Sequence, residues 1–126
     1  MGIKFDFDWE ITMNVRDIVE KLEMKHVDVN RVVCMRSRGS GARGTIARCY
    51  SLSRIWQKAL NIKAHYIIEI IGEKYDTLSE IDKQKTLIHE LLHIPNCFGG
   101  GFKHHGNWVT RDRVDRLHRE YVTKKD

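Results

Sequence analysis

Two histidines and a glutamate stand at a spacing that suits metal-dependent hydrolysis. His89, Glu90 and His93 form the pattern H-E-x-x-H. Residues four positions apart lie one above the other on a helix, so both imidazoles can bind one Zn²⁺ ion. The glutamate that directly follows the first histidine can then accept a proton from water activated by that ion. The pattern therefore predicts a catalytic zinc site with Glu90 as general base.

The surrounding sequence favours a helix over residues 77–94, which begins with a capping box at Thr77 and ends before Pro95. Its apolar residues recur at roughly 100° per residue and form one stripe, made of Leu78, Ile81, Ile88, Leu91 and Leu92. Both histidines fall beside this stripe, and the glutamate falls on its polar flank. We expect one side of the helix to pack on a core while the next side faces a cleft.

A catalytic zinc site needs a third protein ligand and one open position for water. After the helix, glycines at 99–101 allow the backbone to turn sharply, and His104 and His105 follow. We expect one of these two histidines to return over the helix as the third ligand. An acidic ligand from a later helix is the alternative, with three candidates: Asp112, Asp115 and Glu120.

The same residues resemble a minimal zincin-like group described as putative phage metallopeptidases, which are small phage, archaeal and bacterial proteins distantly similar to SprT-like peptidases. The similarity covers roughly residues 30–120, and segments 51–60 and 65–71 contribute to it. Its most specific part is the H-E-x-x-H helix with the glycine-rich turn and the histidine after it. The resemblance implies peptidase activity with one Zn²⁺ per chain, held by His89, His93 and His105.

The remaining pattern predicts further helices at residues 15–24, 54–60 and 111–121. It predicts strands at residues 31–35, 45–50 and 66–71. This order favours an α+β fold, in which the H-E-x-x-H helix packs on a small, mostly antiparallel sheet. Trp56 is expected in the core, and the strand at 66–71 is expected to be buried on both faces.

One polar residue, Glu69, interrupts the apolar strand at 66–71. A buried carboxylate is costly unless it has a partner. Two partners are open at this point: the N–H of a metal-bound histidine, as in many metal sites, or a nearby arginine. Peptide hydrolysis also needs a hydrogen-bond donor that stabilises the tetrahedral oxyanion. The candidates for this donor are His104, Tyr66 and Arg38.

Length and composition indicate one globular domain over residues 1–126, with 41% hydrophobic and 31% charged residues. No apolar run approaches the ~20 residues of a membrane span, and the N-terminus lacks the pattern of a signal peptide. We therefore expect a cytoplasmic location and no membrane partner. Cys34, Cys49 and Cys97 lack C-x-x-C spacing and are expected as reduced thiols, unless the first two lie on neighbouring strands and pair.

The net charge of +5 permits binding to a polyanion but does not establish it. The densest basic stretch, residues 36–44, holds Arg36, Arg38 and Arg43 among glycines and serines. These arginines suit non-specific contacts to nucleic-acid phosphates, a substrate carboxylate, or a solvated loop. The favoured function is hydrolysis of a protein or peptide substrate. The alternatives are a zinc-stabilised DNA-binding module, an SprT-like role on DNA-bound proteins, and hydrolysis of another amide or ester.

Overall fold

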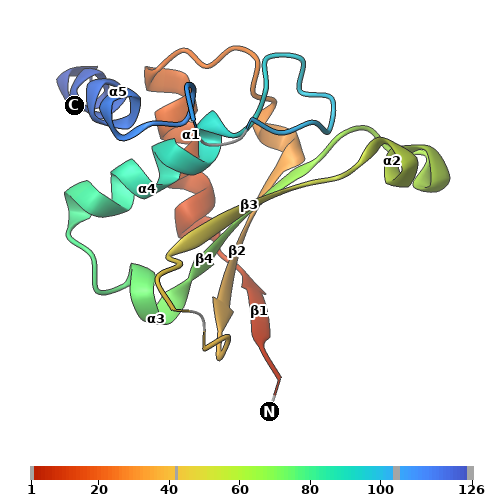
Figure 1. The fold of residues 1–126 in the computed structure, drawn as a ribbon, viewed down its shortest axis with the longest axis horizontal. Coiled ribbons are helices and arrows are strands. Elements are labelled where there is room, and N and C mark those ends of the chain that lie inside the picture. Colours follow the sequence, from red (N-terminus) through yellow and green to blue (C-terminus); the bar gives the residue numbers. More distant parts are fainter. Residues whose placement is uncertain (1, 42, 104–105, 125–126) are drawn as a thin grey trace.

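The structure is a computed structural model that describes residues 2–41, 43–103 and 106–124 (Figure 1). Its elements in chain order are β1 (Lys4–Phe7), α1 (Trp9–Lys21), the 3-10 helix η1 (Val29–Arg31), β2 (Val32–Arg38), β3 (Ala47–Ser51), α2 (Arg54–Leu60), β4 (Tyr66–Ile71), α3 (Gly72–Tyr75), α4 (Glu80–Leu92) and α5 (Arg111–Lys124). No helix among the described residues is long and apolar enough to cross a bilayer.

Four strands form one sheet in the order β1-β2-β4-β3. The pairs β1–β2 and β3–β4 are antiparallel, whereas β2–β4 is parallel. The predicted α+β fold with a mostly antiparallel sheet is therefore confirmed. Strand β4 lies inside the sheet, which explains its apolar sequence, and its bounds agree with the predicted strand at 66–71.

The helices α1 and α4 pack on one face of this sheet. Alternate residues of β4, such as Ile68 and Ile70, are fully buried and belong to the same apolar cluster as Ile18 of α1 and Leu91 of α4. Ile67, between Tyr66 and Ile68, is 39% exposed, so the opposite face is open there. The expectation that this strand is buried on both faces is wrong at that position, whereas Glu69 and Ile71 of the same face are buried.

Polar caps set two helix starts that differ from those predicted. Helix α1 begins at Trp9, not after Asn14, because the Oδ1 atom of Asp8 accepts a hydrogen bond from the Ile11 amide at 2.9 Å. Helix α4 begins after Ser79, whose Oγ accepts from the Asp82 amide at 3.1 Å. The predicted cap Thr77 instead donates its hydroxyl to a carbonyl of α3.

The cysteines are free thiols, and the strand order excludes the disulfide considered above. Cys34 on β2 and Cys49 on β3 both align with Ile68, on opposite sides of β4. The two strands are thus not neighbours. Burial raises the pKa of Cys34 to about 11, so this thiol remains protonated near neutral pH.

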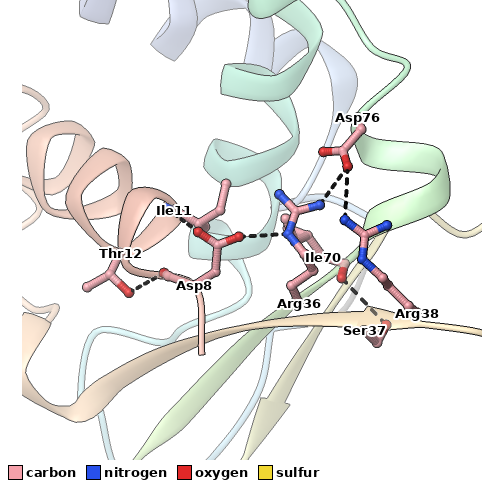
Figure 2. A network of polar contacts seen from close by, with 8 residues as sticks. All are labelled: Asp8, Ile11, Thr12, Arg36, Ser37, Arg38, Ile70 and Asp76. Carbon is pink, nitrogen blue, oxygen red and sulfur yellow. Dashed lines mark hydrogen bonds and ion pairs between the residues drawn. The ribbon is translucent and has the colours of Figure 1, made fainter. Parts of the chain in front are cut away.

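An ion-pair network joins the sheet to α1 and to the end of α3 (Figure 2). The Arg36 guanidinium contacts Asp8 at 2.9 Å and Asp76 at 2.7 Å. Arg38 lies 3.7 Å from the same Asp76 carboxylate. The side chains of Arg36 and Asp8 are only 19% and 11% exposed, so little solvent screens their attraction. Arg36 and Arg38 belong to β2 and not to the loop that their sequence suggested.

Arg36→Met should lower the free energy of unfolding by about 2 kcal/mol, between the values typical of exposed and of fully buried ion pairs. Methionine keeps the aliphatic stem but leaves the Asp8 carboxylate without its cation. Urea denaturation measures the loss. Lys124→Met is the control, because Lys124 bridges two carboxylates at the surface, Glu23 and Glu120, and should cost less than about 1 kcal/mol.

A double-mutant cycle with Asp8→Asn isolates the pair itself, because asparagine still caps a helix. The loss in the Asp8→Asn, Arg36→Met double variant should be smaller than the sum of the two single losses. Additive losses would show that the pair contributes nothing beyond its separate members.

Candidate functional site

The H-E-x-x-H residues occupy the last turn of α4, as predicted. The imidazole rings of His89 and His93 lie with their centroids 5.2 Å apart and their planes at 74°. His89 is half-buried, whereas His93 is 4% exposed and is the C-cap of the helix. The helix therefore brings the two imidazoles together on one side.

Contacts with the segment after the helix fix the orientation of His93. Its Nδ1 atom is hydrogen-bonded to the carbonyl oxygen of Lys103, and the Lys103 amide donates to the His93 carbonyl at 2.7 Å. The Phe102 ring stacks on the imidazole at 4.9 Å. Because a carbonyl only accepts, Nδ1 is the donor, and in a neutral ring the lone pair then lies on Nε2. Histidines that bind metals are commonly held in this way.

The glycine-rich turn is built into the fold by contacts with two side chains. The Tyr66 hydroxyl donates to the Gly101 carbonyl at 2.7 Å and accepts from the Gly100 amide at 3.0 Å. The Gln57 amide donates to the Gly99 carbonyl at 3.1 Å. Gly100 has φ +99°, and a Cβ there would lie 2.5 Å from the carbonyl oxygen of Leu52, so only glycine fits. Tyr66 thus serves the turn, which accounts for its hydroxyl without a role as oxyanion donor.

A cleft of about 720 Å³ lies beside α4, and both His89 and Glu90 line it. Its other walls come from the start of β3, from α4 and from α5. They are made of Gly44, Thr45, Ile46, Ala47, Leu78, Asp82, Lys85, Thr86, Arg111, Val114 and Asp115.

Glu90 is buried at the inner wall of this cleft and does not lie on an exposed polar flank. It is 6% exposed, because the neighbouring Leu87 and Leu91 carry this side of α4 into the core. Burial raises the pKa of Glu90 to about 7. Burial and, second to it, the Glu90 carboxylate also raise the pKa of the Cys49 thiol on β3. A carboxyl that titrates near pH 7 can both accept and release a proton under ordinary conditions.

The third metal ligand is the part of the site that the structure leaves open. His104 and His105 lie outside the described residues, and within these no three histidine, cysteine or acidic side chains gather as a metal site. Of the acidic alternatives, Asp115 lines the cleft, where its carboxylate pairs with Lys85 at 3.1 Å. Glu120 instead pairs with Lys124 on the same helix.

Glu69 has an arginine and a tyrosine as partners. Its carboxylate accepts from the Tyr50 hydroxyl at 2.5 Å and lies 3.8 Å from Arg48. Because Glu69 alternates along β4 with the residues that face the helices, it points away from α4. Of the two partners considered for this carboxylate, the structure shows the arginine.

The charged walls of the cleft were not predicted from the sequence. Asp82, Lys85 and His89 follow one another at helical spacing along α4, which is a signal that periodicity could have revealed. Arg111 and Asp115 face them from the first turns of α5. Their approach depends on how α5 packs against α4, which no local pattern specifies.

Comparison with known proteins gave one match. The sequence model of a family described as "Putative phage metallopeptidase" matches residues 7–121. Neither the curated proteins nor the solved structures contain a match to the chain. The family description implies a peptidase that uses a metal cofactor. Since the match runs from the end of β1 into α5 and includes the whole H-E-x-x-H helix, the chain belongs to this phage metallopeptidase family.

Proposed function

We propose that the protein is a zinc-dependent peptidase in which His89, His93 and His105 hold the metal and Glu90 is the general base. One observation carries the proposal: a buried glutamate and its neighbouring histidine open onto a cleft, on a helix whose second histidine has a fixed ring orientation. A structural zinc site has four protein ligands and no use for a base. The cleft beside Glu90 therefore favours catalysis.

The donor set of the described residues suits zinc. Two imidazoles come from one helical turn, and the bond from Nδ1 of His93 to Lys103 leaves Nε2 as the ring nitrogen with a lone pair. Lys103 is held against His93 through both of its backbone groups. His104 and His105 follow it directly in the sequence, which supports a third ligand from this pair. The family resemblance favours His105.

Zinc, when bound, supplies a Lewis acid that polarises the scissile carbonyl and acidifies water. Glu90 then accepts a proton from the attacking water and passes it to the leaving amine. Its raised pKa suits both steps, although a nearby cation would lower that pKa again. The low exposure of Glu90 keeps bulk water away from the carboxylate while the cleft admits substrate.

An edge strand beside the cleft supports a peptide as substrate. Among the described residues, β3 pairs only with β4, so its other edge is unpaired. The cleft is lined by Ala47 at the start of β3 and by residues 44–46 just before it. The unpaired backbone groups of an edge strand can bind an extended peptide as an additional strand. Such binding would lay the substrate backbone along the wall that faces His89 and Glu90.

Purified protein should contain about one zinc ion per chain, and His89→Ala or His93→Ala should lose it. His105→Ala should lose more metal than His104→Ala. Elemental analysis after dialysis measures the content, and far-UV circular dichroism verifies the fold. His65→Ala is the control, because the His65 imidazole is hydrogen-bonded to the Lys63 carbonyl and lies outside the H-E-x-x-H helix. Full zinc occupancy without His89 or His93 would exclude the proposed site.

Glu90→Gln should retain zinc but hydrolyse peptides about 10²–10⁴-fold more slowly, because an amide cannot accept the proton of water. A fluorogenic peptide library and a generic protein substrate give the rates. Glu80→Gln is the matched control, since Glu80 is an exposed carboxylate on the first turn of the same helix. Equal rates for Glu90→Gln and the wild type would exclude Glu90 as the base. Cleavage of small esters but not of peptides would assign a different substrate class.

In metal-free protein, the same Glu90→Gln change should increase stability at high pH. The ordinary pKa of 4.5 applies to the unfolded chain, whereas burial raises the folded value to about 7. The folded state therefore holds the proton more tightly, and its stability falls as pH rises from about 4.5 to about 7. Glutamine removes this penalty, which amounts to at most about 3 kcal/mol above pH 7 and disappears below the unfolded pKa. Urea denaturation at pH 5 and pH 8 tests this; a difference that does not change with pH would contradict it.

A further inference from the structure

The positive charge of the chain is concentrated in one continuous stretch. No aspartate or glutamate occurs over residues 31–68. The same stretch holds the cations Arg31, Arg36, Arg38, Arg43, Arg48, Arg54, Lys58 and Lys63. Because the whole chain has 22 lysines and arginines against 17 acidic residues, the remainder carries a net negative charge.

Some of these cations form ion pairs with carboxylates in the structure, and others do not. Arg31 pairs with Asp28 at 2.9 Å, Arg36 and Arg38 approach Asp76, and Arg48 lies near the buried Glu69. In the described part of the chain, no carboxylate forms an ion pair with the other four, which are Arg43, Arg54, Lys58 and Lys63. The cations without an ion pair therefore lie mainly around α2 and not at the arginines of β2. Of these four, Lys63 is near enough to the Asp28 carboxylate to help lower its pKa.

Helix α2 stands at the tip of an arm formed by β3 and β4 (Figure 1). A hydrogen bond from the Leu52 amide to the His65 carbonyl, 3.0 Å long, extends the β3–β4 ladder towards the helix. No residue of α2 is buried. Trp56 is 57% exposed, so the prediction that it lies in the core is wrong. We call residues 48–65 the basic arm.

A seven-residue helix that buries nothing gains little from its own hydrogen bonds in water. Its exposed Ile55, Trp56 and Leu60 therefore suit a surface that a partner covers. A second copy paired through α2 would place Arg54 and Lys58 against their own counterparts, and no acidic side chain of the arm could offset that repulsion. Charge complementarity thus points to a polyanion.

Two features favour nucleic acid over an anionic membrane. The cations extend along the arm from Arg54 to Lys63, as contacts to successive phosphates require, whereas α2 is shorter than the helices that lie in a bilayer surface. Two aromatic rings are exposed on the same arm, with Tyr50 43% and Trp56 57% accessible. Exposed rings on a cationic segment are a usual means of binding unpaired bases.

We propose that the basic arm binds single-stranded nucleic acid, with Arg54, Lys58 and Lys63 at phosphates and Trp56 and Tyr50 stacked on bases. The proposed contacts of the arm use neither histidine of the H-E-x-x-H helix, and binding needs neither zinc nor Glu90. Gln57 of the arm anchors the glycine-rich turn through its amide and is left unchanged in the variants below. Failure of the peptidase proposal would therefore leave this one standing, and the reverse also holds. The proposal moves the nucleic-acid contacts from Arg36 and Arg38 to the arm.

Fluorescence anisotropy with a labelled oligothymidine, titrated at several salt concentrations, tests the cations. Binding should weaken steeply with salt, and the variant with Arg54, Lys58 and Lys63 all changed to alanine should reduce the slope of log K against log salt by about 2, at ~0.7 per contact. The control removes the same charge elsewhere, with alanine at Lys25, Arg116 and Arg119, which are exposed outside the arm. An unchanged slope in the arm variant, or an equal change in both, would overturn the proposal.

Trp56→Ala tests the stacking. It should weaken oligothymidine binding by ~5-fold or more without altering the salt slope, since stacking releases no counterions. Binding to a hairpin duplex should be weaker than to the single strand and should not depend on Trp56. Vesicles of phosphatidylglycerol and phosphatidylcholine are the competing ligand. Co-sedimentation of the wild type with these vesicles, in the absence of oligothymidine binding, would assign the arm to a membrane and overturn the proposal.

Discussion

Reciprocal hydrogen bonds between His93 and Lys103 hold the candidate site together. The backbone of Lys103 donates to the carbonyl at the end of α4 and accepts from the imidazole of the same histidine. These contacts satisfy a helix terminus, select one histidine tautomer and return the chain to the site. They depend on the turn before Lys103, which is itself anchored by hydrogen bonds to Tyr66 at the start of β4 and to Gln57 of α2.

Helix α4 meets two requirements that conflict. Its apolar residues must enter the core, yet the same side carries a carboxyl whose ionised form is disfavoured by burial. Glu90 could be moved into solvent only by rotating Leu87 and Leu91 out of the core. The fold therefore accepts a local loss of stability to keep a buried carboxyl beside the cleft, as is common at functional sites.

Local chemistry accounts for what the sequence could predict. The H-E-x-x-H helix and β4 were found because periodicity and apolar content are local, and α5 because Thr110 caps it. The short strand β1 and the helix cap at Asp8 were not predicted. All four residues of β1 are exposed, and the strand is stabilised by its pairing with β2, which no local pattern reveals. Likewise, the separation of Cys34 from Cys49 follows from β4 entering the sheet between their strands, which is a matter of topology and not of local pattern.

Strand β3 links the two surfaces to which functions are assigned. Ala47 at its start lines the cleft, whereas Tyr50 and Ser51 at its end belong to the basic arm. Five residues of β-strand span about 17 Å, so β3 separates the cleft wall at Ala47 from the start of α2 by roughly that distance. The charges along this path also differ. In the cleft Lys85 is neutralised by Asp115, whereas Arg54 and Lys58 of the arm form no ion pair with any described carboxylate and have no acidic residue nearby in the sequence. If both proposals hold, a protein substrate would meet the electrostatically balanced cleft, and the polyanion would bind separately at the cationic arm.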